Sequence, residues 1–187
     1  MKSKRSLIIP LILLALALLL LTACGNNQTP EDKAHQFLST LLADDAELQQ
    51  LLLDSFTVIG EGVPAPTEEE LAERAEREEA LTQMLHDRFD GLASPALIDK
   101  NATDGQLTYW QTLLSFNWVK VTVNDFGFLA PDKYGREVFE ATLHCVRGCE
   151  EKDLPLKGYL SFDEEGLIDS FHLYEEEAGS LTGWLMR

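Results

Sequence analysis

Positive charge is scarce in this sequence of 187 residues, which has 15 Lys and Arg residues against 32 Asp and Glu residues. Such a surface repels phosphate backbones, so the composition excludes a nucleic-acid-binding protein. Cysteine is also rare, at three residues, which excludes a fold held together by many disulfides. The motifs GxSxG, GxxxxGK[ST] and HExxH are absent as well, so no local signature names a reaction.

The N-terminal segment has the pattern of an export signal. Lys2, Lys4 and Arg5 precede an apolar run of roughly 15 residues, from Leu7 to Leu21, as in secretory signal peptides. A permanent membrane-spanning helix needs about 20 apolar residues, so this run is too short for that role. We therefore expect the segment to direct export.

The residues that follow, Leu21-Thr22-Ala23-Cys24, resemble the lipobox of bacterial lipoproteins at all four positions. The resemblance implies that Cys24 receives a diacylglycerol and that a peptidase removes residues 1–23. Several acyl chains, at about 0.8 kcal/mol per buried methylene, make a stable anchor. Residue 26 is Asn. An Asp at this position would resemble a signal that retains lipoproteins in the inner membrane, so the outer membrane remains open as a location. We expect an extracytoplasmic, lipid-anchored protein of the cell membrane or the outer membrane.

The mature chain is predicted to be one acidic domain. Residues 1–23 hold three basic residues and no acidic one, so 12 basic and 32 acidic residues remain, a net charge of −20. Residues 24–29 form the lipidated cysteine and its tether, and residues 30–187 are long enough for a single core. The charge permits a cationic partner, and it also favours solubility beside a membrane.

Two further cysteines, Cys145 and Cys149, lie three residues apart in HCVRGCEE. Outside the cytoplasm such a pair predicts a disulfide across a strand end, with Gly148 in the turn. Two free thiols are an alternative. A metal site with His144 is a third, although no second pair has ligand spacing.

Apolar residues recur at helical spacing in the first half of the domain. Thr29 can cap the first helix, and Thr67 with Glu70 fits a capping box. The predicted helices cover residues 30–55 with a break at 44–45, residues 67–91, and residues 95–101.

In the second half of the domain, apolar and polar residues alternate with a period of two, which indicates strands. The predicted strands are 116–124, 137–145, 156–162 and 167–174, the last two joined by a turn at 163–166. Residues 108–115 fit either an earlier strand or a helix that leads into the first strand. Helices followed by an antiparallel meander define an α+β fold.

This order resembles the nuclear transport factor 2-like fold, also called cystatin-like, in which N-terminal helices pack on a curved antiparallel sheet to form a cone. The closing hairpin, GYLSFDEEGLIDSFHLYEE, is the most similar part, because families of this fold often end with a strand, an acidic turn and a closing strand. Other small α+β lipoprotein modules are alternatives. Some enzymes of this fold, such as ketosteroid isomerases and dehydratases, use an Asp or His base inside the cone.

Strand parity predicts two different sheet faces. The inward face is aliphatic and aromatic, without a proton-transfer pair: Val119, Val121, Val123, Phe139, Ala141, Leu143, Leu160, Phe162, Phe171 and Leu173. The opposite face carries Trp118, Tyr159, His172 and Tyr174, together with His144. Amphipathic aromatic side chains anchor interfaces, so we predict an interaction face there. The alternative is that the C-terminal tail covers this face through Trp184.

The sequence therefore predicts a lipid-anchored, non-catalytic binding domain. Its expected partner is a protein, which includes a second copy of the chain, or a small apolar ligand. We expect no catalytic residue, metal or cofactor. The alternative function is a small acid–base enzyme, isomerase-like or dehydratase-like, with its site inside the cone.

Overall fold

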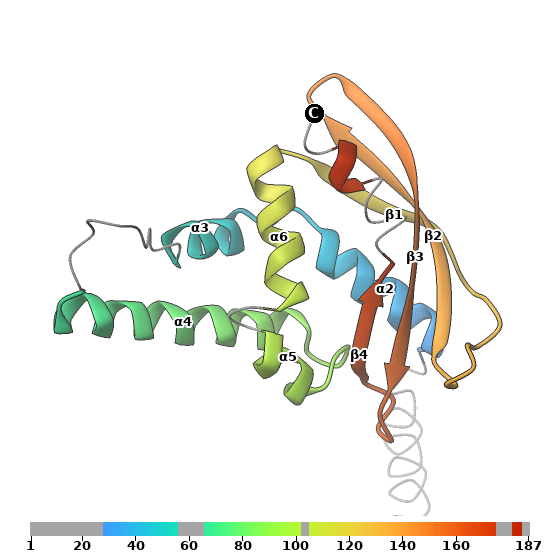
Figure 1. Ribbon diagram of the computed structural model, residues 1–187, viewed down its shortest axis with the longest axis horizontal. Helices are drawn as coiled ribbons and strands as arrows, with labels where there is room; N and C mark the ends of the chain where they lie inside the picture. Colours follow the sequence, from blue (N-terminus) through green and yellow to red (C-terminus); the bar gives the residue numbers. More distant parts are fainter. Residues whose placement is uncertain (1–27, 56–65, 102–104, 175–180, 185–187) are drawn as a thin grey trace, which may run out of the picture.

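The computed structural model describes residues 28–55, 66–101, 105–174 and 181–184. The predicted signal peptide, residues 1–23, and the predicted lipidation site, Cys24, lie outside the described residues. Figure 1 shows an α+β arrangement in which the helices precede an antiparallel sheet. Among the described residues, no helix is long and apolar enough to cross a bilayer.

The helices confirm the expected boundaries closely. Their bounds are α2 Pro30–Leu42, α3 Ala46–Ser55, α4 Glu68–Arg88, α5 Pro95–Asn101 and α6 Gln106–Asn117. Thr29 and Asp32 form a capping box at the start of α2, and Thr67 and Glu70 form another at the start of α4. Each box satisfies backbone amides that a helix start leaves without partners.

The strands form one open sheet in the order β1-β2-β3-β4, with every neighbouring pair antiparallel. Their bounds are β1 Lys120–Phe128, β2 Glu137–Arg147, β3 Glu150–Phe162 and β4 Ile168–Leu173. Residues 92–94 continue the sheet beyond β4 through hydrogen bonds with Ile168. The edge of β4 is thereby covered at its first residue.

Two strand boundaries differ from the prediction. Residues 116 and 117 end α6, so β1 begins at Lys120 and continues to Phe128 through an irregularity between Asn124 and Gly127. β3 begins at Glu150, six residues before the predicted start, because β2 and β3 pair along their whole length. Residues 150–153 are all charged, so they show no alternation of apolar and polar residues that would have predicted this part of the strand.

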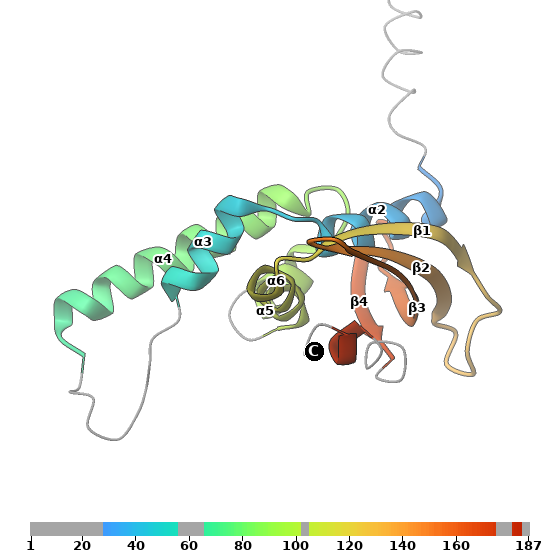
Figure 2. The same ribbon diagram turned by 90° about the horizontal axis from the view of Figure 1, so that it is seen from above.

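The core lies between α2 and one face of the sheet, as expected (Figure 2). Phe37 of α2 is fully buried, and its ring contacts Phe89 at 5.3 Å and Phe171 of β4 at 5.2 Å between centroids. Phe126 of β1 stacks on Phe139 of β2 at 5.5 Å. Aromatic rings therefore fill the space between helix and sheet.

The C-terminal end of α2 is joined to two other helices by side chains. Arg88 of α4 donates to the carbonyl oxygens of Thr40, at 2.9 Å, and Ala43, at 3.3 Å, and forms an ion pair with Asp45. Gln111 of α6 is buried and donates to the Leu41 carbonyl. These donors satisfy carbonyls that a helix end leaves without partners.

We predict that Arg88→Ala lowers the free energy of unfolding by about 2 kcal/mol, because it removes a partly buried ion pair with Asp45 and the side-chain donor to the carbonyls of Thr40 and Ala43. Urea denaturation measures the change. The matched control is Arg74→Ala on the same helix, whose ion pair with Glu78 is exposed. The control should cost no more than about 0.5 kcal/mol. Equal losses in the two variants would contradict the role of Arg88.

Candidate functional site

The outer face of the sheet carries a cluster of three partly buried rings: Tyr159 of β3, His172 of β4 and Tyr174 just beyond it. Their centroids are separated by 5.5 Å between Tyr159 and His172, and by 6.3 Å from Tyr174 to each of the other two. The sheet register places Tyr159 opposite His172. Strand parity predicted that these three residues share a face, and the structure brings them into contact.

Arg136 covers one end of this cluster. Its guanidinium carbon lies 3.6 Å from the centroid of the Tyr159 ring, in cation–π geometry. Asp132 accepts a hydrogen bond from Arg136 Nε at 2.7 Å. This bond lowers the pKa of Asp132 below its ordinary value and raises the pKa of Arg136. The pair stays ionised, so Arg136 adds little net charge to the face.

The exposed side of α6 is apolar and uncharged. The helix contains no Asp, Glu, Lys or Arg between Gln106 and Asn117. Residues 106, 109, 113 and 116 fall within an arc of roughly 80° at 100° per residue, so they share one side. On that side, 50% of the surface of Tyr109 and 56% of that of Phe116 are exposed. Its opposite side buries Leu107, Trp110 and Leu114 in the core.

Gln106 joins the two surfaces. Its side-chain amide lies 3.3 Å from Nδ1 of His172, so the first turn of α6 contacts the sheet cluster directly. From Gln106, the apolar side of α6 extends about 15 Å to the C-terminal end of the helix. We call these two surfaces together the aromatic band, which consists of Tyr159, His172, Tyr174, Gln106, Tyr109, Leu113 and Phe116, with the C-cap residue Trp118 at its end.

Trp118 lies on α6, which corrects its predicted placement on the sheet face. It is the C-cap residue, its amide donates to the carbonyls of Leu114 and Ser115, and its φ of 53° is in the left-handed region. The surface of its side chain is 85% exposed, the largest value among the large hydrophobic residues described. The prediction from strand parity was wrong for Trp118 because α6 extends into residues 116–117, which alternate as a strand does.

Residues 181–184, the described part of the C-terminal tail, lie away from Tyr159. Trp184 is buried, and Arg147 at the far end of β2 lies 4.7 Å from its ring and donates to its carbonyl at 3.2 Å. Arg136, beside Tyr159, precedes the opposite end of β2. Trp184 therefore packs at the other end of the sheet, and the alternative that it covers Tyr159 is wrong.

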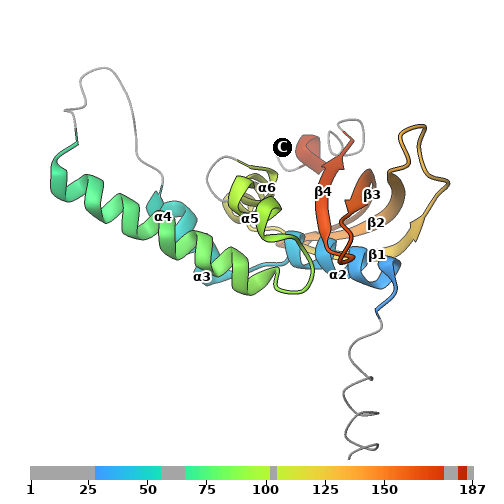
Figure 3. The same cartoon turned by 90° about the horizontal axis from the view of Figure 1, so that it is seen from below.

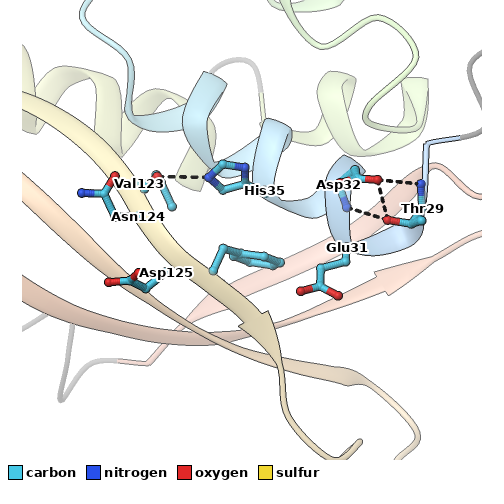
Figure 4. Close-up of a pocket in the computed structure, with 8 residues that line it drawn as sticks. Thr29, Glu31, Asp32, His35, Val123, Asn124 and Asp125 are labelled. Carbon is cyan, nitrogen blue, oxygen red and sulfur yellow. Dashed lines mark hydrogen bonds between the residues drawn. The ribbon is translucent and has the colours of Figure 1, made fainter.

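A second candidate site is an open cleft of about 620 Å³ between the start of α2 and the irregular part of β1. Its lining includes Glu31, Asp32, His35 and Asp125. Figure 4 shows His35 directed at the Val123 carbonyl, 3.0 Å away, while Asp32 turns back to Thr29. The hydrogen bonds from Thr29 lower the pKa of Asp32. The histidine and the carboxylate thus serve separate structural contacts and form no proton-transfer pair.

Two other histidines, His144 and His86, are hydrogen-bonded to carboxylates at the surface. His144 lies 2.8 Å from Asp153 across β2 and β3, and His86 lies 2.7 Å from Asp99. Within the described ranges, no group of three or more His, Cys, Asp or Glu residues has the geometry of a metal site. The polar side chains that the structure buries there are neutral and hydrogen-bonded: Ser94, Thr108 and Gln111.

Cys145 and Cys149 are free thiols, which corrects the predicted disulfide. Cys145 is fully buried and faces the core from β2, opposite Lys152, whereas Cys149 lies exposed in the β2–β3 turn. Val146 and Arg147 continue β2, and Gly148 and Cys149 form the turn that follows, so the two thiols lie in different surroundings and form no disulfide. Burial raises the pKa of the Cys145 thiol to about 11.

No family model matches the chain, and comparisons with curated proteins and with solved structures also give no match. The interpretation of the site therefore depends on the chemistry of the residues described above.

We predict that a maleimide modifies Cys149 but not Cys145 in the folded protein at pH 8. Three pH units below a pKa of about 11, only roughly one thiol in a thousand is ionised. The thiolate fraction of Cys145 should rise only as the pH approaches 11. Peptide mass mapping identifies the modified residue, and the Cys149→Ser variant should take up no label until it is unfolded. Equal labelling of both thiols would contradict the burial of Cys145.

Proposed function

We propose that this protein is an extracytoplasmic lipoprotein whose single α+β domain binds a protein partner and catalyses no reaction. Residues 21–24 support the lipid anchor, because their small side chains and thiol suit lipid transfer and cleavage before Cys24. The anchor would keep the domain at the cell membrane or the outer membrane. The acidic surface of the mature chain favours solubility beside that membrane.

The aromatic band is the observation that supports partner binding. The centres of protein interfaces are depleted in charge and enriched in Tyr, Trp and Phe. In a chain with 32 acidic residues, α6 has no charge and exposes Tyr109, Phe116 and Trp118. Together with Tyr159, His172 and Tyr174 it offers a surface of this composition on both helix and sheet. A second copy of the chain is one partner that such a surface could bind.

We propose further that the domain is a nuclear transport factor 2-like cone. The packing of α2 on one face of a four-stranded antiparallel sheet supports this assignment. Phe37, Phe126 and Phe139 occupy the space inside, which favours the outer band over an interior site for a small apolar ligand.

The alternative of an acid–base enzyme has less support. An acid–base site inside the cone needs a titratable pair with a shifted pKa. Apart from Cys145, the residues that the structure buries in the described ranges are apolar or neutral. His35, the histidine nearest to the core, is bonded to a backbone carbonyl.

The lipid anchor is tested by Cys24→Ser. Because serine provides no thiol for lipid transfer, the variant should lose all labelling by a fatty-acid analogue in cells, whereas the unchanged protein is labelled. Cys149→Ser is the matched control, since it removes the exposed thiol and leaves residue 24 intact. Continued labelling of Cys24→Ser would show that the lipobox assignment is wrong.

Partner binding is tested by a photoreactive residue at position 118 in living cells. We expect a discrete crosslinked species whose yield falls about tenfold when Tyr109→Ala or Phe116→Ala is added, since interface aromatics often contribute more than 1.4 kcal/mol. The control is the same photoreactive residue at position 71, because Leu71 is 50% exposed on α4, outside the band. Identical products from both positions would contradict a specific band.

A further inference from the structure

The loop between β1 and β2, residues 129–136, differs in composition from the rest of the surface. Leu129 is 40% exposed and Tyr134 is 70% exposed. Lys133 Nζ lies 4.8 Å from the centroid of the Tyr134 ring, and the Arg136 guanidinium carbon lies 5.1 Å from it. The loop has two basic residues and one acidic residue, in a mature chain of net charge −20.

This loop lies at the same end of the domain as the start of α2. Glu31, in the first turn of α2, approaches Gly127 near the end of β1: a Cβ built there would lie 3.9 Å from Glu31 Oε1. Lys33 donates to the carbonyl of Gly166 in the β3–β4 turn at 2.6 Å. Figure 1 shows the loop, the β3–β4 turn and the start of α2 at the end of the domain opposite the free end of α4, and in Figure 3 the loop extends to the side of the sheet away from α2.

The tether to the proposed anchor is short. Only residues 25–28 separate Cys24 from Thr29, where the described helix cap begins. Five residue steps span at most about 17 Å when fully extended. A lipid on Cys24 would therefore hold this end of the domain at the membrane surface.

We infer that loop 129–136 rests in the headgroup region of the bilayer, with Tyr134 and Leu129 at the boundary of the acyl chains. This inference depends on the lipid anchor of the proposed function. Tyr suits the membrane interface because its ring is apolar and its hydroxyl stays hydrated. Lys133, whose ammonium lies over the Tyr134 ring, provides a cation for the phosphate groups, while Arg136 stays paired with Asp132.

The neighbouring β3–β4 turn determines which lipid the loop contacts. Asp163, Glu164 and Glu165 lie in this turn and outnumber the basic residues of the loop. An anionic membrane surface repels them, whereas a zwitterionic surface does not. We therefore assign the loop to zwitterionic headgroups.

The test uses the full-length protein as bacterial cells process it, extracted with detergent and added to phosphatidylcholine vesicles. An environment-sensitive fluorophore is attached at position 134 in a Tyr134→Cys, Cys149→Ser variant. The matched control carries the same fluorophore on native Cys149, which lies beyond the other end of β2, about 35 Å away along 11 residues of strand. Cys145 is buried and stays unlabelled.

We expect a blue-shifted emission at position 134 and about threefold stronger quenching by headgroup-linked nitroxide lipids than at position 149. Vesicles with added phosphatidylglycerol should reduce this difference. Equal quenching at the two positions would overturn the loop contact, as would a blue shift at 134 that persists without vesicles and indicates contact with a second copy.

Co-sedimentation with the vesicles separates this inference from the proposed function. If both labelled proteins sediment and their quenching is equal, the anchor is supported and the loop contact is wrong. If neither sediments, the anchor is wrong, and the loop inference fails with it.

Discussion

The C-terminal carbonyls of α2 are enclosed by other helices, and their hydrogen bonds come from side chains distant in the sequence. Arg88 of α4 bonds to Thr40 and Ala43, and Gln111 of α6 bonds to Leu41. Burial lowers the pKa of Arg88, but Asp45 opposes this effect and keeps the guanidinium charged. Three helices are fixed at this point. Because Gln111 is on the buried side of α6, the same contact sets which side of α6 faces solvent, and thereby the position of the aromatic band.

Local signals in the sequence were sufficient for most of the helices and for the order of elements. The cap at Thr29 and the capping box of Thr67 and Glu70 marked two helix starts that the structure confirms. The α6–β1 boundary was not predictable in the same way. Residues 116–124 alternate as a strand does, yet the first two complete a helix, because Leu107, Trp110 and Leu114 bury against the core and extend α6 to Asn117. Tertiary packing overrides a local period of two here. Tertiary packing also explains why Cys145 is a free thiol. Its side chain lies on the inward face of β2 and is therefore buried in the core.

The candidate site was predictable where it depends on strand parity and not where it depends on helix packing. Tyr159, His172 and Tyr174 were assigned to one face, and their rings are in contact. Tyr109, Phe116 and Gln106 were missed, because the segment 108–115 had no clear period. A signal was nevertheless present: no charged residue occurs from Gln106 to Val119 in a sequence that is 25% charged. A helix that buries one side and remains uncharged on the other has a composition that solubility alone does not favour.

Trp118 has an unfavourable backbone conformation and an exposed side chain, which is consistent with the proposed role of the band. Its backbone has a φ of 53°, a conformation that Gly adopts freely and that costs other L-residues roughly 1–2 kcal/mol. A large aromatic side chain at this C-cap therefore lowers the stability of the free domain relative to glycine. The exposed ring gains little from burial in return, since 85% of its surface remains in water. Contact with another molecule would bury that ring and offset the conformational cost, and Tyr109 and Phe116 on the same helix provide the adjoining apolar surface for such a contact.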